Sequence, residues 1–141
     1  MCSYKKIEGM TNMIEVNQLT KDYGPVKAVK GISFQVAKGA LFAFLGSNGA
    51  GKSTTIEILC TLLDPSSGDV QINGHELGTI KANAAIRESI GIVFQQSILD
   101  AKLTVKENIV HRGRFYQLSK KQLQENYAFV QQYLQLEDIE S

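Results

Sequence analysis

The chain has 141 residues, of which 43% are hydrophobic and 21% are charged, and its formal net charge is +1. This composition is typical of a single globular domain. The balanced charge argues against a nucleic-acid partner, and two cysteines are too few for a disulfide framework. No apolar run approaches the roughly 20 residues of a membrane span, and the N-terminus lacks the apolar core of a secretory signal.

Residues 1–12 are polar and are predicted to form a loose tail. Alternating or continuous apolar runs then predict short strands, at residues 13–20, 29–36, 41–45, 69–72 and 90–94. The run at 41–45 is apolar throughout, which favours a strand buried on both faces. A turn is expected at residues 22–25, and Asn73 with Gly74 forms the strongest short hairpin signal in the chain.

Helices are predicted at residues 54–60 and 79–89, and two more follow. Thr104 can cap one that runs toward Phe115, and Ser119 with Gln122 forms a capping box for the other. The last helix carries apolar residues at helical spacing, namely Leu123, Tyr127, Val130 and Leu134. Packing within its own subdomain is the favoured interpretation of this stripe, and a partner-facing helix is the alternative.

One stretch between a predicted strand and a predicted helix fits the pattern G-x-x-x-x-G-K-[ST], with Gly46, Gly51, Lys52 and Ser53 at the fixed positions. Glycines let backbone N–H groups converge on an anion, and the helix dipole points to the same place. Lys52 is expected to reach the β- and γ-phosphates, and Ser53 to ligate Mg²⁺. The predicted nucleotide-binding residues of the loop are Gly46, Ser47, Asn48, Gly49, Ala50, Gly51, Lys52, Ser53 and Thr54.

The remaining candidate reactive residues are isolated from one another. Cys60 falls in the helix after the loop and is expected to be a buried free thiol. His75 and His111 stand alone and are expected at the surface, so no metal-ligand cluster is predicted.

Together these motifs resemble the start of an ATP-binding cassette (ABC) ATPase, the nucleotide-binding subunit of an ABC transporter. The resemblance runs from Ile14 to about Leu118 and rests on Tyr23 with Gly24, the alternating run at 28–36, the phosphate loop with the segments after it, and the run at 90–95. In this family an aromatic residue at the position of Tyr23 stacks on adenine; a turn tyrosine is the alternative.

The resemblance also assigns a role to Gln95, which ends the run at 90–95. In the family this glutamine contacts Mg²⁺ or the attacking water and links the core to the helical subdomain. Gln96 competes for the role, and a loop glutamine without contacts is the third possibility. The implied catalytic residues are therefore Lys52 and Gln95, and the implied Mg²⁺ ligands are Ser53 and Gln95.

Residues 103–109 and 113–118 resemble the exporter branch that serves ABC-2-type membrane partners, including drug-resistance exporters. In the family this region meets the membrane subunit. His111, Arg112 and Arg114 could serve that contact, although a solvated basic face is an equal alternative.

The resemblance implies an α/β fold: a P-loop NTPase core with an antiparallel β subdomain over residues 13–96, and the start of a helical subdomain over 97–141. The family's glycine-rich signature, acidic Mg²⁺ and base residues, and switch histidine are not found. We therefore interpret the chain as the N-terminal portion of a longer ATPase, inactive by itself. An apolar edge at 41–45, which lies beside the acidic strand in the family, is expected to make the 141-residue chain poorly soluble.

The intact protein would hydrolyse ATP with Mg²⁺, act as a peripheral subunit at the cytoplasmic face, dimerise with a second ATP-binding subunit and bind a transmembrane permease, with export the expected direction. Three alternatives stay open. They are a soluble cassette ATPase of translation or repair, a P-loop kinase or GTPase, against which Tyr23 and the run at 90–95 argue, and a nonfunctional fragment.

Overall fold

The structure is a computed structural model that describes residues 11–94, 97–116 and 118–136. It divides into two compact units, Met1–Ile92 and Val93–Ser141, which are described separately below. A loose tail is predicted at residues 1–12, and residues 1–10 of it lie outside the described residues. Within the described ranges, no helix combines the length and apolarity needed to cross a membrane.

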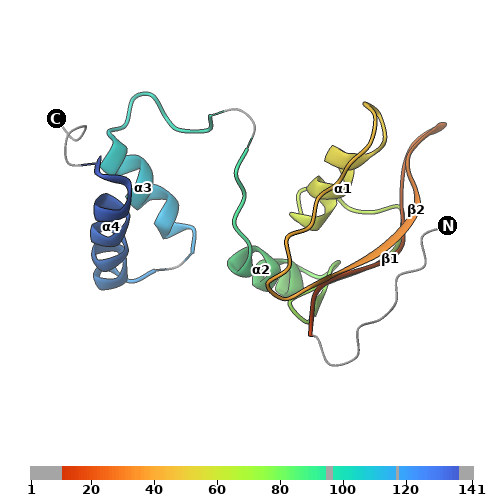
Figure 1. Cartoon of the computed structure of the whole chain (residues 1–141), viewed down its shortest axis with the longest axis horizontal. Helices are drawn as coiled ribbons and strands as arrows, with labels where there is room; N and C mark the ends of the chain where they lie inside the picture. The colour runs from red at the N-terminus through yellow and green to blue at the C-terminus, as the bar shows by residue number, and fades with distance from the viewer. Residues whose placement is uncertain (1–10, 95–96, 117, 137–141) are drawn as a thin grey trace. The chain divides into compact units, whose positions relative to one another are not determined.

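The first unit is built on an antiparallel sheet in which the strands follow the order β2-β1-β3-β4. Its strands are β1 (Asn12–Tyr23), β2 (Val26–Ala37), β3 (Ser67–Ile72) and β4 (His75–Glu76). Figure 1 shows β1 and β2 as one long hairpin, in which Tyr23 pairs with Val26 across the turn. The strands predicted at 13–20, 29–36 and 69–72 are therefore confirmed, and the first two are longer than expected.

The predicted hairpin at Asn73 and Gly74 is confirmed as well. Both residues have positive φ, 49° and 78°, and they join β3 to β4 with Ile72 paired to His75. Two successive positive φ angles define the type I′ turn, whose twist matches that of the strands it joins. Gly74 supplies one of these angles without the steric cost of a side chain.

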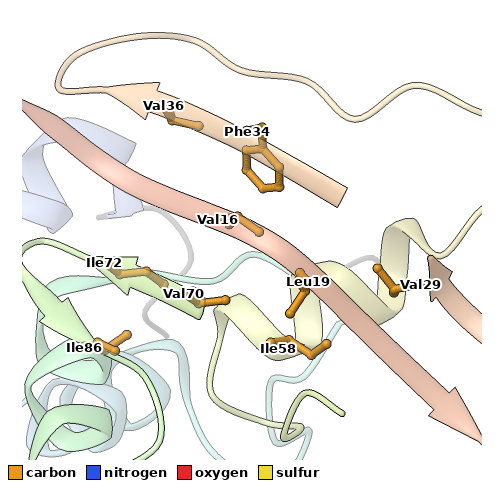
Figure 2. Close-up of a cluster of buried hydrophobic side chains, with 9 residues drawn as sticks. All are labelled: Val16, Leu19, Val29, Phe34, Val36, Ile58, Val70, Ile72 and Ile86. Carbon is orange, nitrogen blue, oxygen red and sulfur yellow. The ribbon is translucent and has the colours of Figure 1, made fainter. Parts of the chain in front are cut away.

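Two helices complete the described part of the first unit, α1 (Lys52–Leu59) and α2 (Ile80–Ser89). The Thr79 hydroxyl caps α2 by accepting from the Ala82 amide, as its place before the helix favours. Ile58 of α1 and Ile86 of α2 are both fully buried against the sheet. Figure 2 shows Ile58 beside Leu19 of β1, so both helices contribute to one hydrophobic cluster with the strands.

Alternation along β3 and at Phe34 and Val36 of β2, together with register shifts in the pairing of β1 with β2, places one set of side chains in that cluster. Its buried members are Val16, Leu19, Val29, Phe34, Val36, Ile58, Val70, Ile72 and Ile86 (Figure 2). A fully buried aliphatic side chain contributes about 1.5–3 kcal/mol relative to an exposed one. This cluster fixes the sheet beneath the glycine loop.

The prediction of a doubly buried strand at residues 41–45 is wrong in this structure. The segment has no strand partner among the described residues, and Leu41 and Leu45 are 101% and 91% exposed. Its other face is packed: Phe42 stacks on Phe34 of β2 with 5.1 Å between ring centroids, and Phe44 meets Phe34 edge-on at 5.0 Å. A run that is apolar on both faces needs packing partners on each face. Among the described residues, partners are found on the face that meets β2.

The strand predicted at residues 90–94 is also not formed. Ile92, in the first unit, is 37% exposed, and Val93 and Phe94, in the second, are 98% and 45% exposed. As at 41–45, no described strand lies alongside to accept its backbone hydrogen bonds. Apolar sequence predicts that a strand is possible, but pairing partners decide whether it forms.

The described part of the second unit is helical, with α3 (Val105–Arg114) and α4 (Lys120–Leu134). Both predicted N-caps are present as full capping boxes, Thr104 with Glu107 and Ser119 with Gln122. The hydrogen bonds that the Thr104 amide and hydroxyl donate lower the pKa of the Glu107 carboxyl from 4.5.

The predicted apolar stripe of α4 holds for three of its four members. Tyr127 is buried and Leu123 and Val130 are half-buried, but Leu134 is 57% exposed. The helix ends at Gln135, which has a left-handed backbone conformation (φ 51°), and the chain then buries Leu136. The reversal after α4 therefore replaces the expected fourth contact.

Candidate functional site

The glycine loop leads from the extended segment at 41–45 into the first turn of α1. Gly51 is the N-cap residue of α1 and has a φ of 78°, a left-handed conformation that disfavours other residues. A Cβ at this position would lie 2.3 Å from the Ala28 carbonyl oxygen of β2. The loop therefore lies directly against the sheet, and only glycine fits the point of contact.

Lys52 closes the loop on itself. Its Nζ atom donates to the carbonyl oxygens of Gly46 and Ser47, both at 2.7 Å. The Ala50 amide donates to the Ser47 carbonyl at 3.3 Å, which tightens the same turn. The ammonium group is thus held inside the curve of the loop, on the side where the N–H groups of α1 begin.

The N-terminus of α1 is open to an anion. No side chain of the described residues caps it, and no acidic residue lies in its first turn. The first N–H groups of a helix have no intrahelical acceptor and carry the positive end of the helix dipole. Ser53, which is exposed, and Thr54, which is half-buried, both belong to this first turn.

Thr55 is a further residue of the site that the sequence interpretation did not single out. Its side chain is 1% exposed, and its hydroxyl donates to the Gly51 carbonyl at 2.8 Å. This bond anchors the end of the loop to the helix, so Thr55 positions the loop. The sequence does contain a signal for this bond. A threonine four residues after the last loop glycine can donate its hydroxyl hydrogen to the carbonyl one helical turn earlier.

Tyr23 lies at the end of β1, next to the hairpin turn, and is 49% exposed. Its partner Val26 is two residues along β2 from Ala28, which contacts the loop, a separation of about 7 Å along the strand. Lys21 also belongs to this corner: its Nζ lies 5.4 Å from the centre of the Tyr23 ring and donates to the Asp64 carbonyl at 2.7 Å. The sequence interpretation did not single out Lys21.

The remaining candidates divide into three cases. Gln95, and its competitor Gln96, lie outside the described residues. His75 and His111 are exposed, as predicted, and His111 packs edge-on to Phe115 at 5.5 Å. Cys60 is only half-buried rather than buried, and that burial raises the pKa of its thiol.

A Mg²⁺ ion bound with a nucleotide would take only a small number of its oxygen ligands from the protein at this loop. In the described ranges there is no group of three acidic, histidine or cysteine side chains that could hold a metal ion. Mg²⁺ usually keeps several waters and binds through phosphate oxygens and one or two protein ligands. The exposed Ser53 hydroxyl at the start of α1 suits that limited role.

The residue pattern of the loop and its place directly before the N-terminus of α1 are those of a P-loop NTPase. Comparison with known proteins narrows the class: residues 29–141 match the family described as ABC transporter. The chain therefore belongs to the ABC transporter family.

Individual relatives span several transport functions. The chain is 39% identical over 124 residues to the linearmycin resistance ATP-binding protein LnrL of Bacillus subtilis (strain 168), covering 88% of this chain and 39% of that protein. It is 39% identical over 97 residues to the ribose import ATP-binding protein RbsA of Ruegeria sp. (strain TM1040), covering 69% of this chain and 19% of RbsA.

A third relative is the Nod factor export ATP-binding protein I of Rhizobium meliloti (strain 1021), 34% identical over 128 residues, covering 91% of this chain and 38% of that protein. Among solved structures, cbiO1 from Clostridium perfringens, part of the ABC transporter complex cbiONQ, aligns with a TM-score of 0.78 at 27% identity over 92% of this chain and 53% of that one. The chain thus spans less than two thirds of the length of each.

Proposed function

We propose that this chain is the nucleotide-binding portion of an ABC ATPase that uses ATP and Mg²⁺ to drive export across a membrane. The observation that carries the proposal is the loop at residues 46–54, closed by Lys52 at an uncapped helix N-terminus. The intact protein would act at the cytoplasmic face, bound to a transmembrane permease and paired with a second ATP-binding subunit. Nucleic acid is not a proposed partner.

Binding of the phosphates is an exchange of partners at Lys52. In the free loop its ammonium donates to the carbonyls of Gly46 and Ser47. A triphosphate offers charged acceptors instead, and hydrogen bonds between charged groups are roughly twice as strong as neutral ones. The backbone N–H groups of residues 49–54 would hold the remaining phosphate oxygens. Mg²⁺, ligated by Ser53, would neutralise charge on the β- and γ-phosphates.

The base of the nucleotide would stack on Tyr23. The exposed ring stands at the rim of the same sheet that contacts Gly51. Lys21 holds a cation 5.4 Å from the ring centre and is itself tied to the Asp64 carbonyl. We infer that Lys21 fixes the hairpin tip and leaves one face of the ring for adenine.

The described residues supply the phosphate cradle and a base platform but no general base. Gln95 is proposed to contact Mg²⁺ or the attacking water, and phosphoryl transfer needs further groups converging on the same phosphate. We therefore expect the 141-residue chain to bind ATP without hydrolysing it. ATPase turnover above that of the Lys52→Ala variant would contradict this expectation.

The test is the affinity of the 141-residue chain for Mg²⁺-ATP, measured by calorimetry. Lys52→Ala removes the charged contact, so we expect affinity to fall about 10- to 150-fold, the equivalent of a charged hydrogen bond worth about 1.5–3 kcal/mol. Lys81→Ala, at an exposed position on α2, is the matched control and should bind as the wild type does. Equal affinity of the Lys52→Ala variant and the control would overturn the proposal.

Export is proposed from the resemblance of residues 103–109 and 113–118 to the exporter branch, and a resistance protein and a Nod factor export protein match the chain at 39% and 34% identity. Import proteins match it as well, at 39% identity over 69% of the chain and 32% identity over 91%. A soluble cassette ATPase of translation or repair is the second candidate. A second cassette or a long inserted linker in the full reading frame would favour that candidate, and a neighbouring permease gene would favour export.

A further inference from the structure

The helical unit contains a pocket of about 310 Å³ between α3 and α4. Figure 1 shows the two helices side by side, and a Cβ at Gly113 would lie only 2.5 Å from the Leu123 side chain, so they approach closely there. Lys106, Val110 and Arg114 recur every fourth residue along α3 and therefore share one face. That face forms one wall of the pocket, and α4 forms the other with Lys120 and Leu123 among its residues.

Three exposed, positively charged residues line the pocket. Lys106 and Arg114 from α3 and Lys120 from α4 all line it, and none of them forms an ion pair among the described residues. The ion pair found there, Lys121 with Glu125 at 3.8 Å, uses α4 residues that do not line the pocket. Cations brought together in this way repel one another unless an anion is present.

The acidic side chains of the unit's described part are engaged elsewhere. The Asp100 carboxylate accepts from the Lys102 amide, and Glu107 is bound to Thr104 in the capping box of α3. Glu125 pairs with Lys121. No described carboxylate of the unit therefore lines the pocket to neutralise its lysines and arginine.

Tyr127 adds a second, independent sign of a missing ligand. It lines the pocket and is only 9% exposed, and its hydroxyl is buried without a hydrogen-bond partner. Lys106 lies 5.2 Å from the centre of its ring, so the aromatic face already helps to hold one of the cations. A buried hydroxyl without an acceptor costs free energy that an oxygen-bearing ligand would recover.

We propose that this pocket binds a phosphate group, carried by a soluble phosphate ester or by a lipid head group. Phosphate combines a charge near −2 with several strong acceptor oxygens, which matches a lysine on each helix and the planar donor fork of Arg114. The Tyr127 hydroxyl is itself buried, so it would donate to one of these oxygens only if the side chains that cover it move on binding. Val110 and Leu123 would contact the apolar part of the ligand. This site is separate from the glycine loop and does not depend on the proposed function.

The experiment uses the full 141-residue chain with Lys52→Ala, which weakens phosphate binding at the glycine loop. Inorganic phosphate and glycerol 3-phosphate are titrated separately at constant ionic strength while backbone amide shifts are followed by NMR. We expect saturable shifts confined to α3 and α4. Lys106→Gln, Arg114→Gln and Lys120→Gln should each weaken binding roughly five- to tenfold, and Tyr127→Phe about threefold. Lys102→Gln, an exposed lysine of the same unit that does not line the pocket, should have no effect.

A second arm separates the two sources of phosphate. Vesicles of phosphatidylcholine alone are compared with vesicles containing phosphatidic acid, and the bound fraction of the same protein is measured by sedimentation. Saturation by soluble phosphate supports an ester, and binding only to the anionic vesicles, lost in the Arg114→Gln variant but not in Lys102→Gln, supports a head group. The proposal would be overturned if the shifts do not saturate, or if acetate produces the same shifts. It would also be overturned if the shifts persist in all three cation variants, or if vesicle binding is the same in those variants as in the parent protein.

Discussion

Phe42 and Leu41 are neighbours in an uninterrupted apolar run, yet Phe42 stacks on Phe34 of the sheet while Leu41 is fully exposed. In the antiparallel sheet the same kind of sequence is paired on β1 and β3 and covered by α1 and α2. The difference shows that an apolar strand pattern specifies which side chains are available for burial. Burial itself depends on segments that are distant in sequence.

The largest effect is expected where the glycine loop meets the sheet. Gly51→Ala would place a Cβ 2.3 Å from the Ala28 carbonyl and impose a positive φ on alanine. We expect a loss of about 2–5 kcal/mol in unfolding free energy, combining the left-handed backbone cost with overpacking. Urea unfolding measures this loss.

Gly49→Ala is the matched control, because Gly49 has a similar φ of 83° but nothing within 4 Å of the added Cβ. It should therefore show the backbone cost alone. If the two variants are equally destabilised, Gly51 does not touch the sheet as described.

A second prediction compares the packed region with the exposed one directly. Ile58→Ala removes a fully buried side chain and should cost about 2–5 kcal/mol, whereas Leu45→Ala, at a 91% exposed position, should cost less than about 0.5 kcal/mol. Chemical unfolding of both variants measures the contrast. A large cost at Leu45 would show that another segment or a second molecule covers that face.

The same exposed face predicts poor solubility. Leu41→Lys with Leu45→Lys should raise the soluble fraction of the chain without lowering its melting temperature, because both side chains point away from the sheet. A sharp cooperative melt from a soluble wild-type monomer would contradict the expected aggregation.

A third, smaller effect concerns the base platform. Stacking on an aromatic ring is worth about 1–3 kcal/mol per base in nucleic-acid systems, so Tyr23→Ala should weaken ATP binding by about 5- to 150-fold. Tyr23→Phe keeps the ring and should bind nearly as the wild type does. Competition with inorganic triphosphate provides the check, since its affinity should be the same in all three proteins.

The smallest effect is the pH dependence of the capping box at α3. The pKa of Glu107 is lower in the folded chain than its ordinary value of 4.5, so its charge stabilises the folded state above that pH. This contribution is lost as the pH falls through the folded-state pKa. Glu107→Gln should therefore unfold more easily than the wild type near neutral pH, and this difference should disappear at an acidic pH at which Glu107 is protonated in both states. Curves that differ equally at both pH values would contradict the assignment.

Features set by a few neighbouring residues were predictable from the sequence. The capping boxes at Thr104 and Ser119, the hairpin at Asn73 and Gly74, and the glycine loop at 46–53 all depend on contacts within about one helical turn or one tight turn. Each of them has a fixed residue pattern, and the family resemblance that they supported is confirmed.

Features set by distant contacts were not predictable. The one-sided burial of 41–45 depends on Phe34. The contact between Gly51 and Ala28 and the hydrogen bond from Lys21 to the Asp64 carbonyl join segments that no local pattern relates.

β2 touches the segment around the loop at two points, through Phe34 with Phe42 before the loop and through Ala28 with Gly51 after it. The stretch of β2 between these contacts acts as a spacer of fixed length. One inserted or deleted residue there would shift the Ala28 carbonyl relative to Phe34 by about 3.3 Å along the strand, so both contacts could not be kept. Extra residues at the hairpin tip, beyond Ala28, would leave both contacts in place. Length variation among related chains should therefore gather at the tip and be absent from the spacer.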